Sequence, residues 1–315
     1  MIRFVNLTFL WSNSLSFVLR CDYFLDKQDS KEGTFTSNTT TMATLVLGAT
    51  GATGQHVAAQ LLDKGKEVRI IVRDAAKLPP ALAAHPQRAQ LRVVEASVLD
   101  MPAAEFERHV RGCSAVVQCL GHNLTRQGLW GHPRFLVRDS AKKVVDTVRA
   151  VKPETPVKFV VMGSNGIPVD GEVYPIGFRL LTPLLRLLLP PHVDNEATSE
   201  YVRSIPATDP YVQWVVVRPD TLTDDTKVTP YEWIPAMDYD PVFDSSDISR
   251  INVAHAMAQL ATNEGGAFTT WRGKSPALAK MHPRKLPPVP LLKQPGFYFK
   301  AALVLSIAFF LFRRM

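Results

Sequence analysis

The sequence predicts an α/β fold built on a doubly wound parallel sheet. Three observations predict it: short, near-continuous apolar runs, amphipathic segments that follow most of these runs, and a glycine-rich turn directly after the first run. Strands that lack polar alternation are buried on both faces, which is typical of parallel sheets covered by helices. Because crossover connections are right-handed, the alternation of strands and helices places helices on both sides of the sheet.

Strand and helix signals alternate along the chain from residue 44 onward. The expected strands are TLVLG (44–48), EVRIIV (67–72), LRVVE (91–95), SAVVQCLG (114–121), VKFVVMG (157–163) and VQWVVVRP (212–219). The expected helices cover 55–65, 103–110, 135–151 and 248–264, where apolar residues recur at helical spacing. The very apolar segment LLTPLLRLLLPPH (180–192) is expected to form a helix that packs as a flap over the sheet.

Changes in composition divide the chain into four parts. These are a leader (1–41), the α/β domain with a small C-terminal substrate-side part (42–275), a basic linker rich in proline (276–296) and a hydrophobic tail helix (297–315). The prolines of the linker lack the N–H groups that a helix or a strand needs. For the leader, a targeting sequence, a weak signal anchor and a disordered segment are all open alternatives. The acidic residues between Asp22 and Glu32 are unusual in a transit peptide.

The tail combines an uncharged run, AALVLSIAFFLF (301–312), with basic residues on both sides. No acidic residue follows Glu264, so the formal charge of +7 is concentrated toward this end. A basic segment beside an apolar one is typical of contact with an anionic membrane rather than with nucleic acid. Because the run is shorter than the roughly 20 residues that span a bilayer, a buried helix is the alternative. We expect a membrane-associated protein whose domain faces the cytosol.

The motif GATGATG (48–54) stands where the first strand ends and the first helix begins. Gly48 allows a sharp turn, Gly51 allows the backbone to approach a pyrophosphate, and Gly54 allows the helix to pack closely on the strand. The helix N-terminus offers unpaired N–H groups and the positive end of its dipole to phosphates. The motif therefore predicts a Rossmann-type dinucleotide site. The residues expected to contact the dinucleotide here are Gly48, Thr50, Gly51, Ala52, Thr53 and Gly54.

The end of the second strand selects between the two nicotinamide dinucleotides. About 20 residues past the last glycine, an acid favours the 2′-hydroxyl of NAD and a base accommodates the 2′-phosphate of NADP. Arg73 comes first at this position and Asp74 follows it. We therefore expect NADPH as the cofactor, with NADH as the alternative that Asp74 supports.

Further motifs accompany the glycine turn. They are VRD (72–74), CLG (119–121), VVMGSNG (160–166) and VVVRPDTLTD (215–224). Together, across residues 45–270, they resemble the atypical short-chain dehydrogenase/reductase group of the NmrA-like or NAD(P)H-binding type, and PPHVDNE (190–196) resembles one subgroup of it. The resemblance implies an NAD(P)-dependent oxidoreductase. It also implies that Gly121 passes near the adenosine ribose and phosphates, that Ser164 faces the nicotinamide, and that Arg218 lies beside the substrate.

The chain departs from this family in its catalytic residues. The Tyr-x-x-x-Lys pair of the larger reductase family is absent after Ser164, because Tyr174 is followed by Phe178 and Tyr201 by Ile205 at the fourth position. The usual proton donor and the lysine that lowers its pKa are therefore missing. Ser97 also stands where members commonly carry an acid that holds the adenine amine.

The remaining catalytic candidates are polar residues that follow the fifth strand, namely Ser164, His192 and Asn195. His192 is the obvious proton carrier near neutral pH, although a surface histidine after two prolines is the simpler interpretation. Asp194 beside it is expected to cap its own helix.

We expect hydride transfer from NADPH to a small carbonyl, quinone or flavin-like acceptor, without any metal. The alternative is a non-catalytic NADPH-sensing or scaffold protein at a membrane.

Overall fold

The computed structural model describes residues 42–281, except 124, 170, 173 and 237–245. The leader (1–41), the hydrophobic tail helix (297–315) and the greater part of the linker lie outside the described residues. Among the helices that the structure does describe, none is long and apolar enough to cross a membrane.

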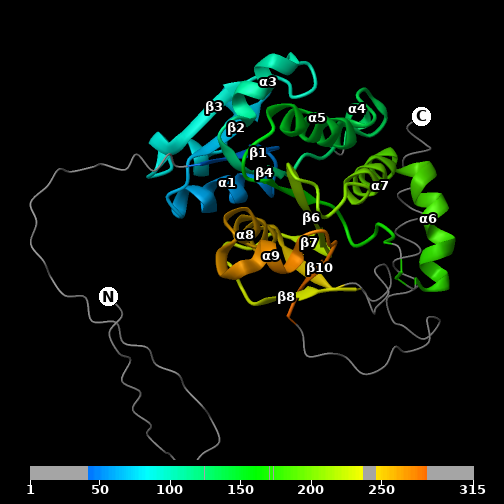
Figure 1. Cartoon of the computed structure of the whole chain (residues 1–315). Helices are drawn as coiled ribbons and strands as arrows, with labels where there is room; N and C mark the ends of the chain where they lie inside the picture. Colours follow the sequence, from blue (N-terminus) through cyan, green and yellow to red (C-terminus); the bar gives the residue numbers. More distant parts are fainter. Residues whose placement is uncertain (1–41, 124, 170, 173, 237–245, 282–315) are drawn as a thin grey trace, which may run out of the picture. The chain divides into compact units, whose positions relative to one another are not determined.

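An eight-stranded sheet forms the centre of the domain, with the strand order β3-β2-β1-β4-β5-β6-β10-β8 (Figure 1). Its strands are β1 (Ala43–Leu47), β2 (Val68–Val72), β3 (Leu91–Glu95), β4 (Cys113–Gln118), β5 (Val157–Met162), β6 (Val212–Pro219), β8 (Tyr231–Ile234) and β10 (Ala277–Lys280). All neighbours pair in parallel except β8 and β10, which pair antiparallel. The chain runs outward from β1 to β3 and then returns to β4, so the topological switch point lies between β1 and β4. Dinucleotides bind at the carboxyl ends of the strands at such a point.

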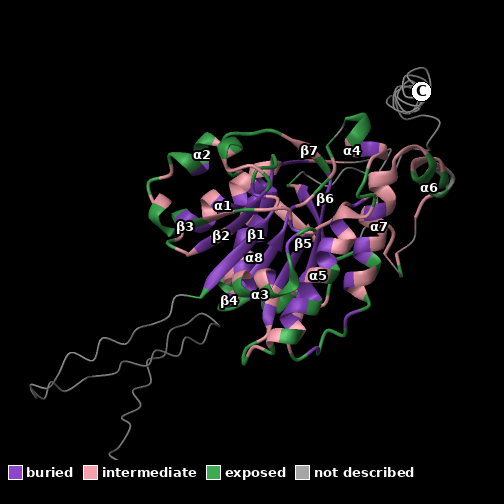
Figure 2. Cartoon of the chain, turned by 90° about the horizontal axis from the view of Figure 1, so that it is seen from above, coloured by how far each residue is buried: buried purple, intermediate pink, exposed green. Residues whose placement is uncertain are grey.

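Helices cover both faces of the sheet, as the sequence predicts (Figure 1). On one face lie α1 (Gly54–Asp63), α8 (Arg250–Thr262) and α9 (Ala267–Trp271), and on the other lie α3 (Ala103–Val110), α5 (Leu136–Val151) and α7 (Pro190–Arg203). The described elements also include the shorter α2 (Pro80–Ala83) and α4 (Arg126–Trp130), the helix α6 (Ile176–Leu188) and a two-stranded sheet of β7 (Thr221–Thr223) and β9 (Asp247–Ser249). Three short 3-10 helices cover Ala75–Lys77, Arg88–Gln90 and Glu264–Gly266. Figure 2 shows the central strands buried between the two helical layers.

Two segments differ from the sequence prediction. The apolar segment 180–192 is not one helix, because α6 ends at Leu188 and α7 begins at Pro190. Proline is favoured at the first position of a helix, where its missing N–H has no partner to lose. Within the segment 276–296, which the sequence assigns to a linker, Ala277–Lys280 forms β10. These four residues include no proline, so their N–H groups can pair with the neighbouring strands, and the sheet extends beyond the expected domain boundary at residue 275.

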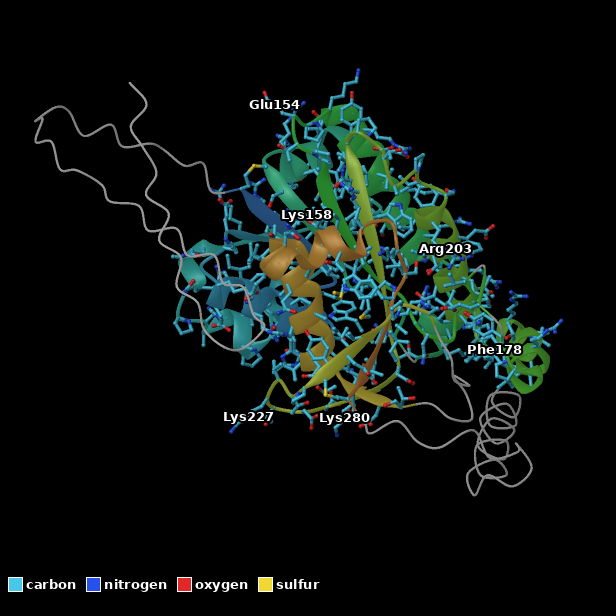
Figure 3. The ribbon with its side chains drawn as sticks, turned by 60° about the horizontal axis from the view of Figure 1, so that its bottom comes forward. Glu154, Lys158, Phe178, Arg203, Lys227 and Lys280 are labelled. Atoms are coloured by element: carbon cyan, nitrogen blue, oxygen red, sulfur yellow. The ribbon has the colours of Figure 1, made fainter. Side chains whose placement is uncertain are left out.

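Figure 3 marks the two ends of the sheet. Glu154 and Lys158 lie at the amino end of β5, and Lys280 lies at the carboxyl end of β10. The glycine turn follows β1 directly and therefore belongs to the carboxyl end.

Candidate dinucleotide site

The three glycines of the turn have different surroundings. Gly48 has a left-handed backbone, with φ of +82°, and a Cβ there would lie 2.6 Å from the carbonyl oxygen of Cys119, just after β4. A Cβ on Gly54 would lie 2.2 Å from the carbonyl oxygen of Gly48. At Gly51 the only atom within 4 Å of a Cβ is the Gly48 oxygen, at 3.2 Å. Gly48 and Gly54 are thus fixed by packing inside the protein, whereas Gly51 is exposed and its Cβ position has one close contact, to the Gly48 oxygen.

The first turn of α1 is suited to an anion. Its N-cap residue, Thr53, makes no side-chain hydrogen bond to the helix, and the first turn contains no acidic residue. The N–H groups of a helix start need acceptors, and the helix dipole favours negative charge there. Thr50, Gly51 and Ala52 are exposed beside this turn, while Thr53 is buried. The residues present therefore fit the pyrophosphate of a dinucleotide.

Arg73 and Asp74, at the end of β2, are placed differently. The Asp74 carboxylate accepts a hydrogen bond from the backbone N–H of Ala76 at 3.0 Å and pairs with Lys77 Nζ at 2.9 Å. The hydrogen bond with Lys77 lowers the pKa of Asp74. Arg73 is exposed, and among the described residues it forms no ion pair. Asp74 is therefore engaged within its own turn, whereas Arg73 is available to a ligand.

The segment after β4 contains a contact that the sequence does not reveal. Gly121, the residue expected near the adenosine ribose, has no atom within 4 Å of a Cβ position. The next residue, His122, places Nε2 2.7 Å from Oδ2 of Asp194. Asp194 lies inside α7 and does not cap that helix, contrary to expectation. Its carboxylate accepts hydrogen bonds from the backbone N–H groups of Val137 and Arg138, in the first turn of α5.

Ser164 lies just past the end of β5, at the carboxyl end of the sheet. Its Oγ accepts a hydrogen bond from the backbone N–H of Gly166 at 3.2 Å, which leaves its hydroxyl hydrogen available for donation. The helix α7 reaches this strand end, because a Cβ on Gly163 would lie 3.6 Å from Oγ of Ser199.

His192 and Asn195, the other two catalytic candidates, lie in the first half of α7. The His192 side chain is 13% exposed and its Nε2 is 3.3 Å from a Glu196 carboxylate oxygen, without the geometry of a hydrogen bond. Burial lowers the pKa of His192, so its ring is neutral at neutral pH. It therefore holds no ready proton for a substrate.

Tyr174 and Arg218 form a buried polar network instead of facing a substrate. Arg218 is fully buried, its guanidinium pairs with the Glu172 carboxylate, and its Nε donates to the carbonyl oxygen of Ser275 at 2.6 Å. The Tyr174 hydroxyl donates to the same Glu172 carboxylate. Burial and this hydrogen bond raise the pKa of Tyr174 to about 12. Phe178 of α6, labelled in Figure 3, stacks on Tyr174 with ring centroids 4.8 Å apart and stands at the fourth position after it. Arg218 and Pro219 end β6, as expected, but the guanidinium of Arg218 is buried against Glu172.

Comparison with known proteins identifies relatives of this fold. The family model described as NAD(P)H-binding matches residues 48–264. A short-chain dehydrogenase/reductase from Veillonella parvula, solved in complex with NADP, has a TM-score of 0.55 and 17% identity over 76% of this chain and 94% of that chain. An anaerobilin reductase from Escherichia coli O157:H7 has a TM-score of 0.52 and 14% identity over 78% of this chain and 100% of that chain. A protein assigned as an NADH-flavin reductase from Streptococcus pneumoniae has a TM-score of 0.52 and 17% identity over 76% of this chain and 100% of that chain.

The glycine surroundings give a prediction that separates binding from folding. Gly51→Val should abolish NADPH and NADH binding, because the added side chain occupies the space of the pyrophosphate. It should cost less stability than a side chain at Gly54, because its Cβ approaches the Gly48 oxygen to 3.2 Å rather than 2.2 Å. Gly54→Ala should lower the free energy of unfolding by about 1–3 kcal/mol, because the Cβ of the alanine overlaps the backbone of Gly48. Thermal unfolding and fluorescence titration measure the two effects. Dinucleotide binding that survives Gly51→Val would show that the turn does not cradle a pyrophosphate.

Proposed function

The chain belongs to the NAD(P)H-binding family of atypical short-chain dehydrogenases/reductases, and from its site we propose that it binds NADPH and reduces a small conjugated acceptor, of the quinone or flavin type. The observation that carries the proposal is the exposed backbone at Gly51 beside a helix start that has neither a side-chain cap nor an acidic residue in its first turn. The exposed Arg73, beside an Asp74 that is already engaged with Lys77, favours the 2′-phosphate of NADPH.

The proton balance favours a conjugated acceptor over a simple carbonyl. Bound NADPH supplies a hydride, which carries two electrons and one hydrogen to the acceptor, and one further proton completes the reduction. A carbonyl that takes a hydride becomes an alkoxide and needs an acid beside it. Tyr174 is held by Glu172 with a raised pKa, and the buried ring of His192 is neutral. A quinone or flavin-like acceptor spreads the negative charge over its rings and can take the proton from water.

Ser164 is the group best placed to orient such an acceptor or the nicotinamide amide. Its Oγ accepts from Gly166, and its hydroxyl hydrogen is available to donate toward the carboxyl end of the sheet. Two proteins of the same fold carry the names of reductases, one of anaerobilin and one of flavin, which supports this class of acceptor.

A non-catalytic NADPH-sensing or scaffold role is the second candidate. The engagement of Tyr174 and Arg218 in internal contacts favours it, because Tyr174 has a raised pKa and Arg218 is fully buried. For either role we propose membrane association through the tail (297–315), with the domain facing the cytosol. This rests on the hydrophobic run and basic flanks of the sequence.

The cofactor assignment predicts selective weakening by Arg73→Ala. The affinity for NADPH should fall about tenfold, the cost of one charge-assisted contact, while the affinity for NADH should change little. Arg92→Ala is the matched control, since Arg92 is also exposed but lies near the amino end of the neighbouring strand β3. Fluorescence titration with both dinucleotides gives the comparison. Equal affinities for NADPH and NADH in the unchanged protein contradict the assignment.

The acceptor class is tested by following NADPH absorbance with quinones, flavins and aldehydes. We expect turnover with quinones or flavins and little with aldehydes. Ser164→Ala should lower the turnover number about tenfold with little change in NADPH affinity, the pattern of a group used mainly in the transition state. Ser204→Ala, at the far end of α7, should have no effect. If no acceptor oxidises NADPH above the background rate, the enzyme proposal fails and the sensing role is favoured.

The tail proposal predicts a change in fractionation. Deletion of residues 297–315 should move the protein from carbonate-washed membranes to the soluble fraction and leave NADPH affinity unchanged, because the proposed dinucleotide site is built from residues between Gly48 and Ser164. Immunoblotting of the two fractions measures the change. A full-length protein that is already in the soluble fraction would refute membrane attachment.

A further inference from the structure

The carboxylate of Asp194 is a junction of three segments. It is fully buried on α7, and it accepts backbone hydrogen bonds from Val137 at 2.8 Å and Arg138 at 3.0 Å, in the first turn of α5. Its Oδ2 also lies 2.7 Å from Nε2 of His122. A buried carboxylate is costly unless hydrogen-bonded, so each of these partners is held in place by the others.

His122 fastens the segment after β4 at a second point. Its side chain is 7% exposed, and Nδ1 lies 3.0 Å from the carbonyl oxygen of Gly128 in α4. Gly128 in turn packs against Asn123, because a Cβ on Gly128 would lie 2.2 Å from the carbonyl oxygen of Asn123. Residues 121–123 are therefore held between α4 and α7.

Both ring nitrogens of His122 face acceptors of the protein. A carbonyl oxygen only accepts hydrogen bonds, so Nδ1 donates to Gly128, and Nε2 faces the carboxylate of Asp194. Both ring nitrogens are thus occupied by the protein. The role of His122 is one of position.

The position of this segment relates it to the dinucleotide. The end of β4 contacts the glycine turn, because a Cβ on Gly48 would clash with the carbonyl group of Cys119. Two residues further on, Gly121 has open space at its Cβ position. Residues 121–123 therefore stand at the switch point between β1 and β4, where a dinucleotide would lie. A wall that is ordered before binding reduces the entropy lost when the ligand binds.

We propose that His122 and Asp194 are positioning residues that hold residues 121–123 as a preformed wall of the dinucleotide site. This inference rests on the proposed binding of NADPH. It separates two functions of Asp194: its bonds to Val137 and Arg138 stabilise α5, and its contact with His122 sets the affinity for the dinucleotide.

Asp209 provides a matched control at the other end of α5. It is also buried, it accepts hydrogen bonds from the backbone N–H groups of Tyr211 and Val212, both at 2.9 Å, and it pairs with Arg149 at 2.8 Å. Arg149 lies in the last turn of α5, and Asp209 precedes the amino end of β6, so this junction is remote from the glycine turn.

The experiment compares Asp194→Asn, Asp209→Asn and His122→Leu in the full chain, by thermal unfolding and by NADPH fluorescence titration. Asp194→Asn and Asp209→Asn should lower the melting temperature by similar amounts, but only Asp194→Asn should weaken NADPH binding, by about tenfold. His122→Leu has similar side-chain volume and leaves the Asp194 bonds to α5 intact. It should weaken NADPH binding to the same extent with a smaller loss of stability, and change the emission of bound NADPH.

Two results would overturn the inference while leaving the proposed function intact. One is a folded His122→Leu variant that binds NADPH as tightly as the unchanged protein, and the other is an equal loss of affinity in Asp209→Asn. If Asp194→Asn does not fold, His122→Leu decides alone. An unchanged protein that binds neither NADPH nor NADH overturns the proposed function, and the inference with it.

Discussion

The contact between the glycine turn and the end of β4 is the constraint on which the site depends. Gly48 adopts a left-handed backbone against the Cys119 carbonyl, and Gly54 lies against the backbone of Gly48. These two approaches bring β1, α1 and β4 together at the switch point of the sheet. Neither position has room for a side chain, so only glycine fits there, and this close packing places the exposed Gly51 at the start of α1.

The same end of the sheet uses its charged groups for internal contacts. Asp194 joins α7, α5 and His122, and Glu172 binds both Arg218 and Tyr174. Such buried pairs are strongly destabilising to break. These two carboxylates therefore hold α5, α7 and the segments that follow β4 and β5 in one arrangement at the carboxyl end of the sheet.

The sequence predicts the part of the structure that local patterns determine. The strands at 91–95 and 212–219 and the helix at 103–110 have the expected bounds, because each is a continuous apolar or amphipathic run. The strand β10 was missed because prolines surround it and its four residues carry no pattern of their own. The pairs His122–Asp194 and Glu172–Arg218 were missed because their members lie 72 and 46 residues apart, and only the folded chain brings them together. A buried acid without a local partner has no signature in a single sequence.

The surroundings of Tyr174 explain why its hydroxyl keeps its proton. Phe178 supplies no positive charge to lower its pKa, and burial and the hydrogen bond to Glu172 raise it. The buried Arg218–Glu172 pair beside this tyrosine ties the segment after β5 to β6 and Ser275. One carboxylate thus holds both the guanidinium and the hydroxyl, so Glu172 accounts for the buried pair and contributes to the raised pKa together.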